Sequence, residues 1–169
     1  FLFNMNGNMQ RRAHPSSRLR RPTVSRLDAH VGYWLRYVSR QFSQALSREL
    51  EDKGVTVAEW VVMRELYDGD RRPADLADKL GLTRGAISKL AEKLVASLMI
   101  TQEPSREDGR AQTLALTDLG RSTVHVLTHL VDRIDEQFFG HLEPNTRALL
   151  VSIMRDIVHR RRLRATPGD

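Results

Sequence analysis

The chain has 169 residues, no cysteine, and a formal net charge of +6 from 27 basic and 21 acidic side chains. This length suits one domain with a real core, and the lack of cysteine excludes disulfide frameworks, thiolate metal sites and cysteine nucleophiles. No apolar run approaches the roughly 20 residues that cross a bilayer. We therefore expect a soluble, cytoplasmic protein.

The excess positive charge lies at the two ends of the chain. Residues 1–26 hold six arginines and no acid, and HRRRLR at 159–164 holds four more. Between these runs, residues 27–158 carry 17 basic and 20 acidic groups, a net charge of −3. Charge alone therefore does not identify a nucleic-acid-binding core. We expect residues 1–26 and 163–169 to be tails, the first of them flexible and rich in arginine.

Apolar residues recur at steps of three and four along most of the chain, a spacing that predicts helices. The first helix is expected from about Asp28 to Glu51, with Gly54 ending it. TVAE at 56–59 is a capping box that begins the second, and DGD at 68–70 breaks it.

Two shorter helices and a hairpin follow. Pro73 begins one helix and Gly81 ends it, and Thr83 caps the next. MITQEP and RAQTLALT then flank an Asp-Gly turn as two short strands. The helical spacing returns at 118–139 and at 144–162, so the expected layout is six helices with one hairpin after the fourth.

Residues 71–94, RRPADLADKLGLTRGAISKLAEKL, read as two helices joined by a tight turn. Ala77 lets the helices approach, Gly81 takes the positive φ of the turn, and Ile87 packs back onto the first helix. These spacings predict a helix-turn-helix. A helical hairpin that binds nothing stays open as the alternative at this point.

The outer face of the second of these helices is small and basic. Counting 100° per residue from Ile87 places small residues near its amino end, where they permit close approach to base edges, while its cations suit phosphates. Glu92 favours the alternative, a solvated charged face. The expected DNA contacts on this helix are Thr83, Arg84, Gly85, Ala86, Ser88, Lys89 and Lys93.

The stretch SREDGRAQTLALT, residues 105–117, favours the DNA-binding interpretation. A helix-turn-helix followed at once by a two-stranded ribbon is the order of a winged helix. Residues 71–112 carry eight basic and six acidic groups, whereas the rest of the core has a net charge of −5. We therefore predict a mainly α fold with a small β-wing, a winged helix-turn-helix with long N- and C-terminal helices.

Three stretches resemble the MarR family of bacterial transcription regulators: residues 77–81, TRGAISKLAEKL and SREDGRAQTLALTDLGR. The resemblance covers roughly residues 28–160. The wing of this family carries Asp-x-Arg followed by Leu-Thr at the next helix, here Asp108, Arg110, Leu116 and Thr117. Two positions depart from the family: Leu98 stands where a glycine usually ends the recognition helix, and Gln102 where a basic residue is common.

The resemblance implies a homodimer on a pseudo-palindromic operator in double-stranded DNA. Residues 27–54 and 118–162 would be dimerisation helices, and residues 55–117 the DNA-binding lobe. Arg110 would enter the minor groove with Asp108 orienting it, although Asp108 could instead only cap the turn. Arg106 is expected to contact a phosphate at the tip of the wing.

The resemblance also implies a small, usually aromatic, effector bound between the dimer helices and the DNA-binding lobe. Core packing is the alternative for each aromatic residue involved. The expected pocket residues are His30, Trp34, Tyr37, Trp60, Met63 and Arg64. We therefore expect a ligand-responsive regulator, more often a repressor than an activator, that needs no cofactor.

Two other functions remain open as alternatives. His125 and His129 lie four residues apart and could face one zinc ion, with Glu143, His141 or His30 as a third ligand, but solvated or core histidines are favoured. A winged-helix dimer that binds protein is the other alternative. The sequence has no glycine-rich phosphate loop, nucleophile elbow or evident carboxylate pair, so we expect no enzyme.

Overall fold

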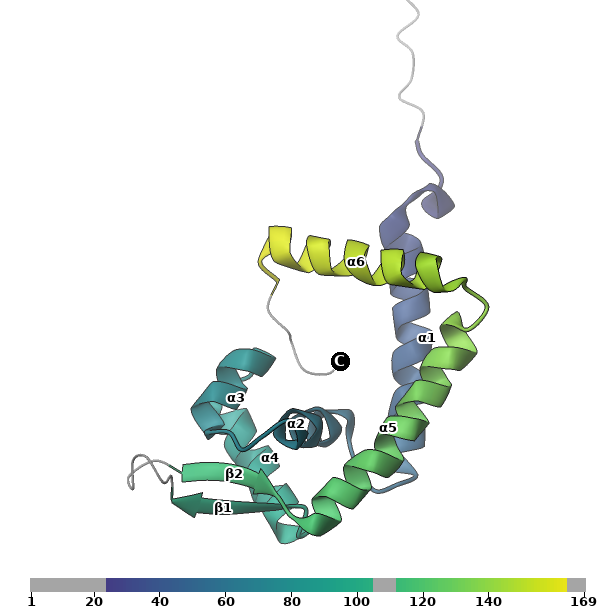
Figure 1. Cartoon of the computed structure of the whole chain (residues 1–169). Helices are drawn as coiled ribbons and strands as arrows, with labels where there is room; N and C mark the ends of the chain where they lie inside the picture. The colour runs from purple at the N-terminus through teal and green to yellow at the C-terminus, as the bar shows by residue number, and fades with distance from the viewer. Residues whose placement is uncertain (1–23, 105–111, 164–169) are drawn as a thin grey trace, which may run out of the picture.

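The computed structural model describes residues 24–104 and 112–163. It is mainly α-helical with one small antiparallel sheet, as predicted (Figure 1). The elements are η1 (Leu27–Ala29), α1 (Val31–Glu51), α2 (Val57–Tyr67), α3 (Pro73–Leu80), α4 (Arg84–Ala96), β1 (Ile100–Pro104), β2 (Gln112–Leu116), α5 (Asp118–Phe139) and α6 (Pro144–Arg161).

The predicted helix signals act as expected. In the capping box of α2, the Glu59 amide donates to Thr56 Oγ1 at 3.3 Å and the Thr56 amide donates to Glu59 Oε2 at 2.8 Å. Gly81 follows α3 with φ of 68°, a conformation that glycine adopts without strain. The first helix starts later than predicted, because His30 is extended and separates α1 from the short turn η1.

The core is centred on the lobe formed by α2, α3, α4 and the two strands, and it continues along α5 to Ile134 and to Leu50 at the end of α1. Leu66, Leu76, Ile87 and Leu114 are fully buried there. The strands pair with Ile100 opposite Leu116, so the hairpin closes over the two helices of the helix-turn-helix. This packing holds the wing strands and α4 in one rigid unit.

The long helices lie at the other end of the molecule. α1 and α5 run side by side, and α6 crosses them and extends away from the column that they form (Figure 1). Arg147 near the start of α6 pairs with Asp135 and Glu136 on α5. No side chain of α6 is buried, although the helix is rich in leucine, isoleucine and valine. Within residues 24–104 and 112–163, no helix combines the length and the apolar content that a bilayer crossing requires.

The end of α4 is closed by a non-glycine residue in the left-handed region. Leu98 has φ of 59°, and its side chain is 69% exposed. Its amide donates to the Val95 carbonyl at 2.9 Å, and the Met99 amide donates to the Leu94 carbonyl at 2.9 Å. The helix therefore ends in the turn that a glycine would normally make, at the expense of strain at Leu98.

We expect Leu98→Gly to stabilise the protein. A left-handed residue with a Cβ costs about 1–2 kcal/mol, part of which the greater unfolded-state freedom of glycine offsets. The net gain should be about 1 kcal/mol, or roughly 3 °C in melting temperature. Thermal unfolding of the two proteins at equal concentration measures it, and a lower melting temperature for the glycine variant would contradict strain at this position.

Candidate nucleic-acid interface

The outer face of α4 is exposed in the structure. Arg84, Gly85, Ser88 and Lys89 are exposed, Ala86 is half-buried, and the opposite face of the helix packs into the core. Nothing lies within 4 Å of the position that a Cβ would take at Gly85. This face therefore presents small and basic groups around the amino end of the helix, with Glu92 also exposed farther along.

Local hydrogen bonds set the amino end of α4. The Ala86 amide donates to Thr83 Oγ1 at 3.1 Å, so the Thr83 side chain caps the helix. Ser88 Oγ donates to the Arg84 carbonyl at 3.0 Å, which directs its hydroxyl back along the helix. The remaining amides of the first turn are those that suit an anion such as a phosphate.

A concavity of about 570 Å³ lies beside this helix end, between α3, α4 and the start of β2. Arg84 and Ser88 line one side and Gln112 another. Arg72, just before α3, donates two hydrogen bonds to Asp75 in that helix, at 2.8 and 2.9 Å, and this contact lowers the pKa of the Asp75 carboxyl. The wing base and the recognition helix thus border one surface.

The other predicted DNA contacts are Lys93 and three residues of the wing. The Lys93 ammonium lies 4.0 Å from the Glu59 carboxylate, on the flank of α4 next to α2. Arg106, Asp108 and Arg110 lie outside the described residues.

The six predicted effector residues do not line one common pocket: some are buried in the core and others are exposed. Trp60 and Met63 are buried in the core of the lobe. Trp34 is 52% exposed, and its indole N–H donates to the Asp28 carbonyl at 2.9 Å. Tyr37 is exposed on α1, and His30 Nε2 lies 2.9 Å from the Ser25 hydroxyl.

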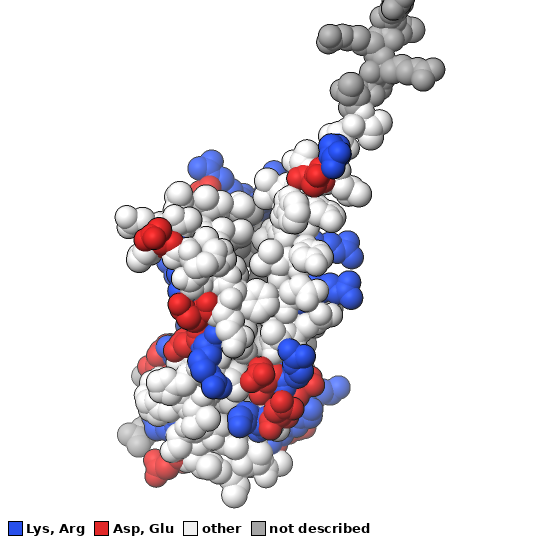
Figure 2. All heavy atoms as spheres, turned by 90° about the vertical axis from the view of Figure 1, so that its right-hand side faces the viewer, with Lys and Arg blue, Asp and Glu red and all other residues white. Residues whose placement is uncertain are grey.

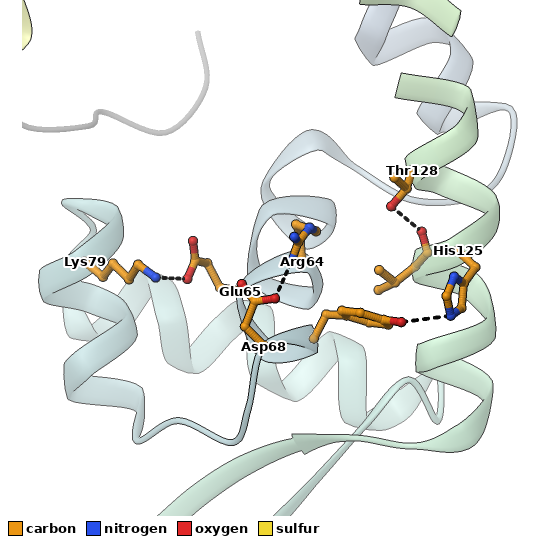
Figure 3. A network of polar contacts seen from close by, with 8 residues as sticks. Arg64, Glu65, Asp68, Lys79, His125 and Thr128 are labelled. Atoms are coloured by element: carbon orange, nitrogen blue, oxygen red, sulfur yellow. Dashed lines mark hydrogen bonds and ion pairs between the residues drawn. The ribbon is translucent and has the colours of Figure 1, made fainter. Parts of the chain in front are cut away.

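Arg64, the sixth of these residues, belongs to a polar cluster between α2 and α5 (Figure 3). The Tyr67 hydroxyl is 2.9 Å from His125 Nε2, and Arg64 pairs with Asp68 at 2.9 Å. The guanidinium groups of Arg64 and Arg121 lie over the Tyr67 ring, 5.6 and 5.9 Å from its centroid. This cluster ties α2 of the lobe to the long helix α5.

His125 is thus engaged with Tyr67, and its neighbour His129 is exposed one turn farther along α5. In the part of the chain that the structure describes, no three histidine, aspartate or glutamate side chains are grouped as a metal ion would need.

A large apolar groove lies between α1 and α6, which the sequence had not indicated. Its volume is about 1290 Å³. Both helices carry apolar residues on more than one face, which is more than the core of one chain needs. This surplus of apolar residues is the feature of the sequence that could have indicated the groove. The apolar lining includes Val31, Trp34, Leu35, Val38, Phe42, Phe139, Leu150, Val151, Met154 and Val158.

Charge is not concentrated on the side of the molecule formed by the long helices. Figure 2 shows basic and acidic side chains interspersed there, with wide uncharged areas between them. This face has no single-sign patch of the kind that attracts nucleic acid.

Comparison with known proteins finds similarity to regulators of the kind that the sequence resembles. The model of the MarR family matches residues 53–111. A curated relative from Bacillus subtilis (strain 168), the uncharacterized HTH-type transcriptional regulator YpoP, is 27% identical over 121 residues, which cover 71% of this chain and 83% of that protein.

Solved structures share the fold along most of the chain. AbsC from Streptomyces coelicolor, a MarR family transcriptional regulator, has a TM-score of 0.71 at 19% identity, covering 83% of this chain and 99% of that one. BpsR of Bordetella bronchiseptica, whose DNA binding is regulated by 6-hydroxynicotinic acid, has 0.70 at 23%, covering 79% and 96%. MepR of S. aureus in complex with DNA has 0.68 at 21%, covering 78% and 98%. The chain is therefore similar to the MarR family of transcriptional regulators: the family model matches residues 53–111, and solved regulators share its fold along most of its length.

Proposed function

We propose that this protein is a sequence-specific DNA-binding repressor that acts as a homodimer on a pseudo-palindromic operator and is released by a small aromatic effector. The observation that carries the proposal is the outer face of α4, where Gly85 and Ala86 leave room and Arg84 and Lys89 supply charge. In a helix-turn-helix, the amino end of the second helix contacts base edges in the major groove.

We propose separate roles for the DNA-binding lobe, the long helices and the tails. Residues 55–117 form the proposed DNA-binding lobe, and residues 27–54 and 118–162 the dimerisation helices, with tails at 1–26 and 163–169. Thr83, Ser88 and Lys93 complete the proposed contacts on α4. In the wing, Arg106 and Arg110 would contact phosphate and minor groove, with Asp108 in support.

Lys89→Ala tests the proposed interface of α4. Loss of one phosphate contact should lower DNA affinity about tenfold and reduce the slope of log affinity against log salt by about 0.9. Fluorescence anisotropy with a labelled duplex at several salt concentrations measures both quantities. Lys53→Ala, which removes an exposed lysine in the turn after α1, is the matched control and should change neither. Equal effects of the two substitutions would remove Lys89 from the interface.

The proposed homodimer rests on the groove between α1 and α6. Leu149, Ile153 and Ile157 on a second face of α6 are 59, 47 and 42% exposed, so the helix is apolar both toward the groove and away from it. Exposing so much apolar surface to water is unfavourable, and large exposed apolar patches mark interaction sites. A second copy of the chain carries the same two long helices, with apolar faces of the same length. We therefore propose that a second copy occupies the groove.

The proposed effector is a small aromatic compound. BpsR, which shares this fold, is regulated by a hydroxylated aromatic acid. Trp60 and Met63 are buried in the core, so the predicted effector residues that remain exposed are His30, Trp34, Tyr37 and Arg64. Anisotropy measurements repeated with a panel of aromatic acids test this part of the proposal: a compound that releases the duplex supports it, and no release by any compound argues against it.

A further inference from the structure

The end of the recognition helix touches the start of α5, although about twenty residues of chain separate them. α4 ends at Ala96, and the left-handed turn at Leu98 leads into β1. Thr117 immediately precedes α5 and caps it. The wing returns the chain to this point, so the two helix ends meet at one junction.

One hydroxyl group joins the two helix ends. Thr117 Oγ1 donates to the Leu98 carbonyl at 2.7 Å, with a longer contact of 3.2 Å to the Met99 carbonyl. The same oxygen accepts a hydrogen bond from the Gly120 amide at 2.9 Å. The Thr117 amide also donates to the Met99 carbonyl, at 3.1 Å. Thr117 therefore connects the turn after α4 with the first turn of α5.

The turn that Thr117 holds is the strained one. The Leu98 side chain is mostly exposed, so packing of that side chain contributes little to keeping φ at 59°. Strained backbone persists where surrounding contacts over-determine it. The hydrogen bonds from Thr117 to the carbonyls of Leu98 and Met99 are such contacts, in addition to those within the end of α4 itself.

The junction lies between the two halves of the protein. α5 packs against α1 along the column of long helices and also against α2 and β2 of the lobe (Figure 1). A change in the direction of α5 therefore reaches the end of α4 through Thr117. A capping threonine that served only α5 would not need the contacts to Leu98 and Met99.

We propose that Thr117 is a positioning residue for the recognition helix, which fixes the direction of α4 relative to α5 and so sets DNA affinity. The inference rests on the proposed function, because it assumes that α4 contacts DNA. A hydroxyl that only stabilised the fold would change the fraction of folded protein. A positioning hydroxyl changes the affinity of protein that remains folded.

The experiment compares Thr117→Val with Thr117→Ser. Valine keeps the shape of threonine and removes the hydroxyl, whereas serine keeps the hydroxyl. With both variants folded, valine should lower DNA affinity about tenfold, a loss comparable to one misaligned base contact, and serine should stay within about threefold of the parent protein. Thr123→Val is the matched control, because the Thr123 hydroxyl donates only to the Leu119 carbonyl of its own helix, at 2.8 Å.

Two further measurements separate a loss of positioning from a loss of folding. Should Thr117→Val fail to fold, the same change is made in the Leu98→Gly background, where glycine takes the turn without strain and the affinity loss should be smaller. Amide exchange at Met99 and Ile100 should be faster in the valine variant. Slower or unchanged exchange, or affinity equal to that of Thr123→Val, would overturn the inference.

Failure of the proposed function gives a different result. If the parent protein binds no duplex DNA, the proposal that α4 contacts DNA fails, while faster amide exchange in Thr117→Val would still place the hydroxyl at the α4–α5 junction. Affinity loss with Thr117→Val and retention with Thr117→Ser supports both.

Discussion

Replacing Gly120 with alanine is expected to destabilise the DNA-binding lobe severely. A Cβ at this position would lie 2.0 Å from the Met99 carbonyl oxygen and 3.0 Å from a methyl group of Leu116. The carbonyl cannot move away freely, because it accepts hydrogen bonds from Thr117. The clash with backbone should cost about 3 kcal/mol or more, a large part of the stability of an ordinary domain.

Urea unfolding followed by tryptophan fluorescence measures this cost at a fixed protomer concentration. Gly85→Ala is the matched control, since it makes the same change in a helix where nothing lies within 4 Å of the new Cβ. That variant should be unchanged or more stable by up to about 1 kcal/mol. Equal midpoints for Gly120→Ala and the parent protein would show that α5 does not approach the end of α4 as closely as described.

The second large effect is expected in the groove between α1 and α6. Val151 lines the groove and is 46% exposed in the single chain. A glutamate there would bury a charge without a partner when a second copy docks, and unpaired buried charge costs several kcal/mol. Val151→Glu should therefore be a monomer of about 19.4 kDa, whereas the parent protein is expected to be a dimer. Because two linked half-site contacts bind far more tightly than one, DNA affinity should fall at least about a hundredfold.

Analytical ultracentrifugation over a range of concentrations gives the oligomeric state. Ser152→Glu adds the same charge to the adjacent, exposed position of α6, which does not line the groove, and it should leave the dimer intact. A parent protein that sediments as a monomer, or a Val151→Glu variant that stays a dimer, would exclude the groove as the interface between copies.

Local sequence signals predicted most of the fold. The capping box at Thr56, the turn at Gly81 and the cap at Thr83 act over three or four residues, and each sits at a helix end in the structure. The absence of a glycine at Leu98 did not change the kind of turn that ends α4, because Leu98 itself adopts the left-handed conformation there.

Contacts between distant segments could not be predicted in the same way. Trp60 and Met63 have the spacing of either a pocket or a core, and only the packing of α2 inside the lobe shows that they are core. The groove depends on the angle at which α6 crosses α1, which no local pattern encodes. Thr117 was predicted as part of a wing motif, but its contact with Leu98 requires the hairpin to return the chain to that point.

We propose that α4 and the wing bind a specific, symmetric DNA sequence, with two copies of the chain acting as a dimer. Selection of bound duplexes from a random pool by the full-length protein tests this most directly. We expect enrichment of an inverted repeat whose half-sites lie about one helical turn, or roughly 34 Å, apart. Lys89→Ala should weaken that enrichment and Lys53→Ala should not. Enrichment of no sequence, or of one without two-fold symmetry, would contradict the account.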